Sequence, residues 1–288
     1  MKDLVTSKTR KKTVSRLPRN FHKSFIPERR FIHALLRFAA GRGTGTIQDI
    51  ANATGIPTGV SSGKVAPTID YCRAMGLLTL PEVRSAIKKP ELTAFGRVVL
   101  LEDPYLKTEI TQWVAHLNLC GEENGAEVWY QTFWNGAARL GPVFERDSLE
   151  NWLASVCNTK PGGLIGPLIS MYQEDASFAI CGALAENGKQ VTRRQMAIRS
   201  EFAWGYSAWL LSAMERIVPC GEQVTLPQIE KACGWRILTG WTSADSERAL
   251  SLIERKGAIS IDRHMQPWIL RAKEPATEAW RFLFSDMI

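Results

Sequence analysis

The stretch from Thr46 to Gly96 constrains the fold more than any other, because helix signals recur in it in a fixed order. Thr46 can cap a helix by accepting from an early backbone N–H, and Asp49 lies three residues later, where the positive end of a helix favours an acid. Gly55 can end that helix in the left-handed conformation. Apolar residues at helical spacing then mark a second helix: Val65, Ile69, Cys72 and Met75. The pattern predicts a short helix, a tight turn and a second helix.

Residues 76–97 follow with the pattern of a hairpin. Residues 76–80 predict a strand, residues 91–97 resume the apolar run, and Lys88 and Lys89 lie between them at the tip. Two short helices followed by such a hairpin is the element order of a winged helix-turn-helix. The inward stripe of the second helix leaves its other side for DNA. The predicted DNA contacts of this first unit are Ser61, Ser62, Lys64, Thr68, Arg73, Lys88 and Lys89.

The same order of elements recurs in the last third of the chain. Residues 202–217 carry an apolar stripe at helical spacing, and residues 224–234 repeat the layout of cap, short helix and glycine. Residues 242–257 predict a further helix, and residues 258–273 alternate in the manner of two strands about a turn. We therefore expect a second winged helix. Its predicted DNA contacts are Arg248, Arg263, His264 and Arg271.

The region between the two units is predicted to be helical and is rich in aromatic side chains. Aromatic residues at helical spacing usually belong to a hydrophobic core. The predicted fold is therefore mainly α, with two winged helix-turn-helix modules flanking a helical middle region. The expected divisions are a basic flexible arm at 1–24, an N-terminal winged-helix domain at 25–104, a helical middle domain at 105–200 and a C-terminal winged-helix domain at 201–288.

The positive charge of the chain is concentrated at its N-terminus. Residues 1–30 hold ten basic and two acidic groups, a net +8, whereas the whole chain carries +7, so the remaining residues carry a net −1. A segment with so few apolar anchors is expected to be disordered alone. Either it is a solvated tail, or it extends a nucleic-acid interface by neutralising phosphates, with Lys11 and Lys12 as its predicted DNA contacts.

The composition argues against a membrane protein. No apolar run approaches the ~20 residues of a membrane helix, and no apolar stretch follows the basic N-terminus as it would in a secretory signal. Six cysteines are scattered without a Cys-x-x-Cys pair, which favours small buried side chains over disulfides or a zinc site. We expect a cytoplasmic protein with no membrane partner.

Residues arranged for catalysis are sparse. The sequence contains no Ser-His-Asp order, no His-Glu-x-x-His motif and no glycine-rich phosphate loop. Glu102 and Asp103 could hold a hard cation such as Mg²⁺, but adjacent residues diverge on a helix, which favours a helix-end cap. Asp147, Glu174 and Asp175 are similarly weak candidates. The motifs therefore assign no catalytic residue, metal ligand or cofactor.

Several short segments together resemble one known family. They are Pro27-Glu-Arg-Arg30, Gly63-Lys-Val-Ala-Pro67, Tyr71-Cys-Arg-Ala-Met-Gly-Leu-Leu78, Leu92-Thr-Ala-Phe-Gly-Arg97 and Glu102-Asp-Pro-Tyr105. On these segments the chain resembles the SspB family, which is encoded in bacterial DNA phosphorothioation loci beside a cysteine desulfurase, an ATPase and a phosphoadenosine-phosphosulfate-reductase-like protein. The resemblance implies nicking of one DNA strand to allow sulfur insertion, with phage defence as the outcome. It also implies Mg²⁺ or Mn²⁺ as the cofactor of a nickase and those three proteins as partners, but it assigns no catalytic residue.

Motifs and resemblance together indicate a protein that binds double-stranded DNA in a phosphorothioation and phage-defence system and nicks one strand. Two alternatives stay open. A non-enzymatic winged-helix regulator would bind a preferred DNA site without cutting it. An adaptor would dock the sulfur-transfer proteins through its winged helices and would bind DNA weakly, since a fold alone does not fix a function.

Overall fold

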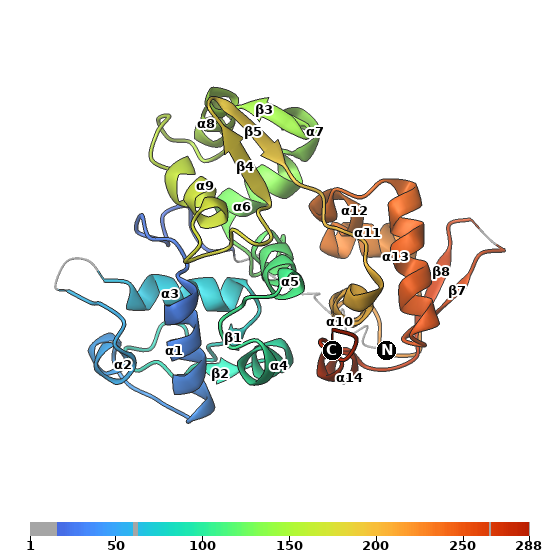
Figure 1. The fold of residues 1–288 in the computed structure, drawn as a ribbon, viewed down its shortest axis with the longest axis horizontal. Helices are drawn as coiled ribbons and strands as arrows, with labels where there is room; N and C mark the ends of the chain where they lie inside the picture. The colour runs from blue at the N-terminus through green and yellow to red at the C-terminus, as the bar shows by residue number, and fades with distance from the viewer. Residues whose placement is uncertain (1–15, 60–62, 265, 288) are drawn as a thin grey trace, which may run out of the picture.

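A computed structural model describes residues 16–59, 63–264 and 266–287 of the chain. Within these ranges the fold is mainly α-helical with three small antiparallel sheets (Figure 1), so the predicted mainly α class is confirmed. None of the described helices combines the length and apolar character needed to cross a membrane.

The first part of the described chain contains short helices and a hairpin, in the predicted order. Its elements are α1 (Arg29–Ala40), α2 (Ile47–Thr54), α3 (Val65–Ala74), β1 (Leu78–Thr79), β2 (Glu91–Leu92) and α4 (Ala94–Glu102). The side chain of Thr46 accepts from the backbone N–H of Asp49, whose carboxylate accepts from the N–H of Thr46, and Gly55 ends α2 with φ +70°. The strand predicted over residues 91–97 is wrong beyond Leu92, because α4 begins there.

The middle of the chain is not wholly helical. Its elements are α5 (Glu109–Leu119), α6 (Glu127–Tyr130), the π-helix η1 (Gln131–Asn135), α7 (Ala137–Leu140), β3 (Val143–Glu145), α8 (Arg146–Val156), α9 (Ile165–Gln173), β4 (Leu184–Asn187) and β5 (Gln190–Arg193). The three strands form an antiparallel sheet in the order β3–β5–β4, with Phe144 opposite Val191. The prediction of a helical middle region is wrong for this sheet, because β3 has only three residues and the turn signal of the β4–β5 hairpin at Gly188 was overlooked.

The last part of the chain follows the predicted order and adds two short elements. It consists of the 3₁₀ helix η2 (Ser200–Phe202), α10 (Ala203–Met214), β6 (Gln223–Thr225), α11 (Leu226–Cys233), α12 (Trp235–Thr239), α13 (Ser243–Arg255), β7 (Ile259–Asp262), β8 (Ile269–Ala272) and α14 (Ala276–Arg281). The strands form a sheet in the order β6–β8–β7, in which Leu270 of β8 lies opposite Val224 on one side and Ile261 on the other. Neither β6 nor α12 was predicted from the sequence.

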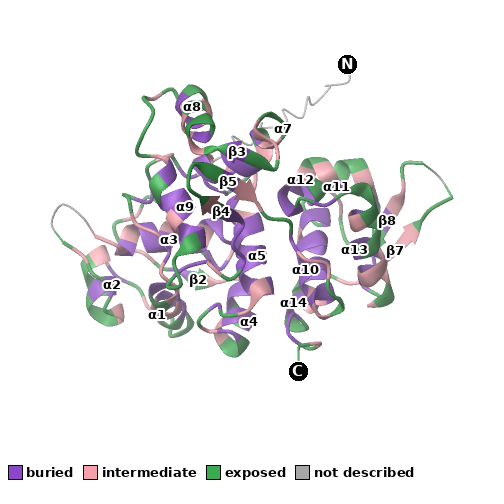
Figure 2. Ribbon diagram, turned by 45° about the horizontal axis from the view of Figure 1, so that its top comes forward, coloured by how far each residue is buried: buried purple, intermediate pink, exposed green. Residues whose placement is uncertain are grey.

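The helix α10 lies at the centre of this part and packs against α5, α11, α13 and α14. Figure 2 shows α5 and α10 as largely buried segments in the middle of the molecule. The rings of Trp209 and Trp235 stack at 5.5 Å between centroids, and the indole N–H of Trp235 donates to Ser246 Oγ at 2.8 Å. These contacts hold α12 and α13 in fixed positions on α10.

The segment at residues 16–24 packs against the middle of the chain. The backbone N–H of Leu17 donates to the carbonyl of Gly125 at 2.8 Å, and the side chains of Leu17 and Phe21 are buried. The prediction of a flexible arm up to residue 24 is therefore wrong for this segment, because two apolar side chains anchor it. Residues 1–15 lie outside the described part of the chain.

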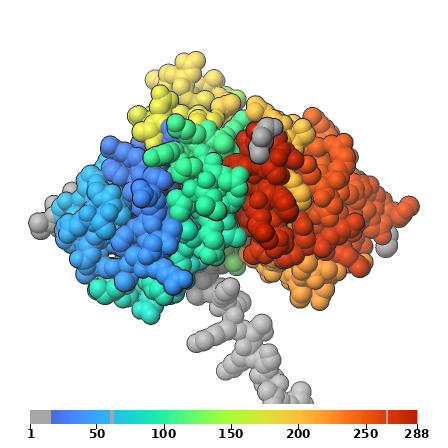
Figure 3. Space-filling model, turned by 60° about the horizontal axis from the view of Figure 1, so that its bottom comes forward, coloured from blue at the N-terminus to red at the C-terminus, as the bar shows by residue number. Residues whose placement is uncertain are grey.

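The helices α4 and α14 lie side by side although they are far apart in the sequence. The rings of Phe95 and Trp280 are 4.8 Å apart between centroids. Figure 3 shows this junction on the surface, where the green segment that includes α4 meets the red C-terminal segment. The N-terminal and C-terminal parts of the chain therefore share one hydrophobic interface in addition to their contacts with the middle region.

A buried histidine makes the stability of the core dependent on pH. His116 is fully buried, its Nδ1 lies 2.6 Å from the hydroxyl of Tyr172, and burial lowers its pKa to about 3. In the unfolded chain this imidazole takes up a proton below its ordinary pKa of 6.5, whereas in the folded protein it stays neutral. Its contribution to stability is therefore complete above pH 6.5 and decreases as the pH falls towards 3.

We expect the free energy of unfolding to fall by about 2 kcal/mol between roughly pH 7 and pH 5 because of His116 alone. The variant His116→Gln should lack this component, so its stability should change less with pH than that of the wild type. Urea unfolding at both pH values measures the difference. The exposed His264→Gln is the control and should keep the wild-type pH dependence; equal pH dependence in all three proteins would contradict the expectation.

Candidate nucleic-acid interface

The face of α3 that was predicted to contact DNA is covered by the protein itself. None of the residues of α3, all of which the structure describes, is exposed. The ring of Tyr71 lies 4.7 Å from that of Phe21 and 5.8 Å from that of Trp129, and its hydroxyl donates to the carbonyl of Phe25. Residues of the 16–25 segment and of α6 therefore occupy the place where a DNA groove would have to lie.

The predicted contact residues on α3 are corrected accordingly. Thr68 is buried and its hydroxyl donates to the carbonyl of Lys64, so the prediction that it faces outward is wrong. Lys64 is half-buried and forms an ion pair with Glu28. Arg73 is also half-buried and forms an ion pair with Asp70 at 2.9 Å. The remaining two residues predicted here lie outside the described part of the chain: Ser61 and Ser62.

The lysines at the tip of the first hairpin differ from each other. The ammonium group of Lys88 donates to the carbonyls of Val83 and Ser85 at 2.8 and 2.6 Å, which ties it to its own loop. Lys89 is exposed, and its Nζ lies 3.2 Å from the carboxylate of Glu91. Lys11 and Lys12 lie outside the described residues. Of the predicted contacts in the first unit, only Lys89 is described as exposed.

The helix α13, in contrast, has an open side. Its inner residues Ala249, Leu250 and Ile253 are buried. The opposite side carries four exposed residues and one half-buried residue, and we call it the α13 face: Ala244, Glu247, Arg248, Ser251 and Arg255. These residues are spaced three or four apart, so they form one continuous strip along the helix.

The start of α13 is fixed by a capping box. The hydroxyl of Thr242 donates to the carboxylate of Asp245 at 2.7 Å and accepts from its backbone N–H at 3.1 Å. The hydrogen bonds that the Asp245 carboxylate accepts from the hydroxyl and the backbone N–H of Thr242 lower its pKa. The same carboxylate accepts from the side-chain amide of Gln195 at 2.8 Å, which holds the chain segment before α10 against the beginning of α13.

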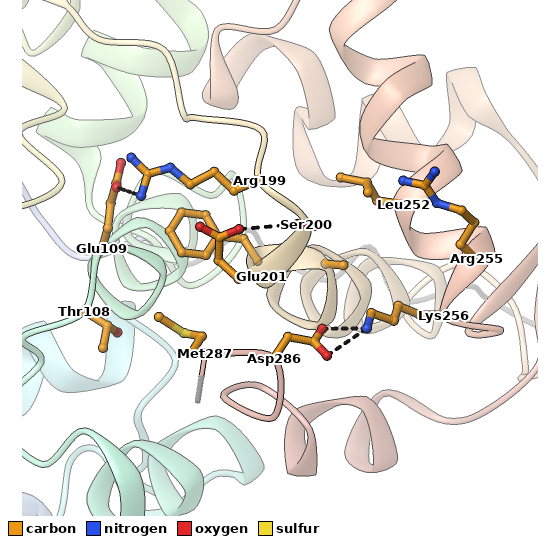
Figure 4. Close-up of a pocket in the computed structure, with 12 residues that line it drawn as sticks. Thr108, Glu109, Arg199, Ser200, Glu201, Leu252, Arg255, Lys256, Asp286 and Met287 are labelled. Atoms are coloured by element: carbon orange, nitrogen blue, oxygen red, sulfur yellow. Dashed lines mark hydrogen bonds and ion pairs between the residues drawn. The ribbon is translucent and has the colours of Figure 1, made fainter.

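A groove runs along the α13 face. One cavity of about 550 Å³ lies between Ile198 and α13, and a second of about 870 Å³ lies between α13, Arg199 and Asp286. The two cavities share lining residues on both walls: Ser200, Leu252 and Arg255. Figure 4 shows Leu252 and Arg255 across the hollow from Arg199. The groove is therefore continuous along α13.

The cations of this groove differ in how far they are neutralised. Arg199 pairs with Glu109 at 3.2 Å, and Lys256 pairs with Asp286 at 2.7 Å. Arg248 makes only a long contact of 3.5 Å to Asp245, and its side chain is 67% exposed. Arg255 forms no ion pair with any described residue. A long and exposed contact such as that of Arg248 with Asp245 contributes little, and Arg255 has no such contact with a described residue. The guanidinium groups of Arg248 and Arg255 are therefore the cations of this groove best able to bind a phosphate.

The second hairpin carries the other predicted contacts of the last unit. Arg263 is exposed and pairs with Glu254 at 2.8 Å, while its guanidinium lies 5.2 Å from the ring centre of Trp268. His264 and Arg271 are exposed as well. The structure thus places all four predicted residues of the second unit at the surface, but Arg271 lies on the middle strand of the sheet and not at its tip.

Arg199, Arg255 and Lys256 were not predicted. Arg255 follows Arg248 by two helical turns, so the spacing of the sequence could have identified it. Arg199 reaches the groove only because the segment before α10 folds across α13, and no local pattern signals that contact.

The acidic residues considered for a metal do not form a site. The carboxylate of Asp103 is buried and accepts from the backbone N–H groups of Lys107 and Thr108 and from the hydroxyl of Thr108, as a loop cap does. Across the described ranges, no group of three or more His, Cys, Asp or Glu side chains is placed to hold a metal ion. The described residues therefore do not fit a resident Mg²⁺ held by several protein ligands.

Comparison with known proteins identifies a fold. No protein-family model matches the chain, and no curated protein matches it in sequence. Two crystal structures match in three dimensions, one described as magnesium ion-bound SspB and one as SspB. Each has a TM-score of 0.68 and covers 93% of this chain and 88% of its own, with 17% and 16% sequence identity. The resemblance to SspB that the short segments indicated is thus confirmed for the fold.

Proposed function

We propose that this protein is a DNA-binding component of a bacterial DNA phosphorothioation system and that it binds duplex DNA through α13 and the β7–β8 hairpin. The SspB-like fold supports the choice of system. The observation that carries the choice of surface is the open α13 face with Arg248 and Arg255, set against the covered α3. Guanidinium groups along an exposed helix are suited to phosphates on either side of a major groove.

Within this proposal, residues 201–288 form a winged-helix domain. The order of α10, β6, α11, α13, β7 and β8, together with the sheet order β6–β8–β7, supports it. Residues 25–104 form the other winged helix, which is the first unit of the chain, supported by the order of α1, α2, α3 and the β1–β2 hairpin. In this first unit the helix α3 serves packing, and residues 105–200 form the domain that covers it together with the 16–25 segment.

The dependence of binding on salt tests this proposal. Each phosphate neutralised by a protein cation contributes about −0.9 to the slope of log affinity against log salt concentration. With contacts from the α13 face and the hairpin, we expect a slope of about −3 or steeper between roughly 50 and 200 mM salt. Fluorescence anisotropy with a labelled duplex measures it. Absence of binding at the lowest salt concentration would contradict the proposal.

We also propose that the protein nicks one strand, as the resemblance implies, with Mg²⁺ or Mn²⁺ as the cofactor. One of the two similar crystal structures is described as magnesium ion-bound, which supports the choice of metal. The described residues contain no group of three or more potential metal ligands, so the proposal names no residue as a metal ligand. Supercoiled plasmid incubated with the protein and either metal should become open circular; plasmid that stays supercoiled would contradict nicking.

The two alternative functions give different results in the same assays. A non-enzymatic regulator would bind a short preferred duplex with a steep salt dependence and would leave the plasmid supercoiled. An adaptor would bind DNA weakly at physiological salt and would co-purify with the reductase-like protein, the ATPase or the cysteine desulfurase. The open α13 face favours a DNA-binding function over an adaptor, because its exposed arginines suit phosphates.

A further inference from the structure

A separate cavity of about 770 Å³ lies beside α13, on the side of the β7–β8 hairpin. It is lined by α11, α12, the first half of α13, the chain just before β8, part of η1 and Glu122. Most of its walls are apolar or aromatic: Trp134, Leu226, Pro227, Ile237, Pro267 and Trp268. Its volume falls in the range of roughly 300 to 1,000 Å³ that is typical of small-molecule sites.

Two tryptophan side chains in this cavity are held in place from outside it. A Cβ atom on Gly234 would lie 3.2 Å from Cε3 of Trp134, so the backbone at the start of α12 approaches this indole closely. The guanidinium of Arg263 lies over the ring of Trp268. Both tryptophans are half-buried, and neither indole N–H donates a hydrogen bond to a described residue. The cavity therefore presents fixed, solvent-accessible aromatic surfaces.

The cavity adjoins the α13 face. Glu247 lines both this cavity and the groove of about 550 Å³, and Ser243 at the start of α13 lines the cavity as well. Figure 1 shows the β7–β8 hairpin standing directly beside α13. A group bound in the cavity could therefore belong to the same DNA molecule that lies along α13.

The charges of the lining favour a neutral group over a phosphate. Glu122, Glu230 and Glu247 line the cavity together with only two cations, Lys231 and Arg236. Glu230 pairs with Arg236 and accepts from the backbone N–H groups of Arg236 and Ile237, whereas Glu122 and Glu247 form no ion pair with a described residue. These two carboxylates disfavour a phosphate and can accept hydrogen bonds from the exocyclic amino groups of nucleobases. Fixed aromatic surfaces are suited to stacking on a base, since every base has a π-face.

We propose that this cavity binds a single unpaired nucleobase of DNA whose duplex part lies on α13. The base stacks on Trp134 or Trp268, and its phosphates stay outside. This inference rests on the proposed function and specifies its substrate as duplex DNA with a locally unpaired base. Stacking on an aromatic side chain strengthens binding by roughly 5- to 150-fold per base.

Two labelled duplexes test the inference, one fully paired and one with 2-aminopurine as a single unpaired base. The wild type is expected to bind the second duplex roughly 5- to 150-fold more tightly and to quench its fluorescence. In the double variant Trp134→Ala/Trp268→Ala, the affinities for the two duplexes should become about equal and the quenching should disappear, because any change in the hairpin contacts of Arg263 affects both duplexes alike. Trp134→Phe/Trp268→Phe should keep the preference, because phenylalanine retains a π-face.

Trp204→Ala is the matched control, since Trp204 is also half-buried but lies on α10, outside the cavity lining. It should bind both duplexes as the wild type does. Equal affinity of the wild type for both duplexes, or an undiminished preference in the double alanine variant, would overturn the inference while leaving duplex binding intact. Failure of the wild type to bind either duplex would overturn the proposed function and this inference together.

Discussion

Replacing Arg248 and Arg255 with glutamate together is expected to weaken duplex binding at least about 100-fold at low salt. A hydrogen bond to a charged group contributes about 1.5 to 3 kcal/mol, and the variant loses two such contacts to phosphate while adding like charges. Both residues are exposed on the α13 face and take no part in the core, so the fold should be unaffected. Anisotropy titrations with one duplex at fixed salt measure the loss.

A control variant with the same change in net charge shows whether the loss of affinity comes from the α13 face or from the overall charge of the protein. Arg139 on α7 and Arg281 on α14 are exposed and lie outside the α13 face and the β7–β8 hairpin. Replacing both with glutamate should change the affinity only slightly, because their contribution is the long-range field alone. If this control lost as much affinity as the α13 variant, the interface would not be on α13.

Replacing Gly96 with alanine is expected to lower the free energy of unfolding strongly. A Cβ atom at this position would lie 1.9 Å from the carbonyl oxygen of Leu77, which is backbone and cannot move aside cheaply. The contact arises because Thr93, which caps α4, also donates its hydroxyl to the carbonyl of Gly76 at 2.6 Å. The first turn of α4 is thereby held directly on the chain before β1.

We expect Gly96→Ala to lose about 3 kcal/mol or more of unfolding free energy, the upper end of the loss that overpacking against rigid groups produces. Thermal and urea unfolding measure it. Gly41→Ala is the control, since a Cβ atom there would meet only carbonyl oxygens at an ordinary 3.6 Å. A Gly96→Ala protein as stable as the control would mean that α4 does not approach Leu77 this closely.

Local signals predicted the helices of the two end regions well. The cap at Thr46 and the left-handed glycine at Gly55 act within a few residues of each other, so their sequence pattern determines their structure. In the sheet of β3, β5 and β4, the strand β3 was missed because it is short and pairs with β5 across a long stretch of sequence, whereas β4 and β5 form a local hairpin whose turn signal at Gly188 was overlooked. Long-range pairing such as that of β3 depends on tertiary context and leaves little local signal.

The difference between local signals and tertiary contacts also explains which parts of the candidate DNA-binding surface could be predicted. The sequence indicated that α3 is amphipathic, but the side predicted to be open is covered through Tyr71, Phe21 and Trp129, which come from three separate segments. Because Thr68 is polar, its side of α3 resembles an exposed surface in the sequence, although another segment of the chain covers it. On α13 nothing comparable covers the exposed side among the described residues, so Arg248 lies at the surface, and its contact with DNA stays a prediction.

Photo-crosslinking from single positions tests most directly the claim that DNA lies on α13 and not at the turn before α3. A photoreactive amino acid is placed at Ser251, in the middle of the α13 face, or at Pro57, an exposed position between α2 and α3. After irradiation with bound duplex, we predict a covalent DNA adduct from position 251 and none from position 57. Adducts from position 57 without any from position 251 would contradict the account.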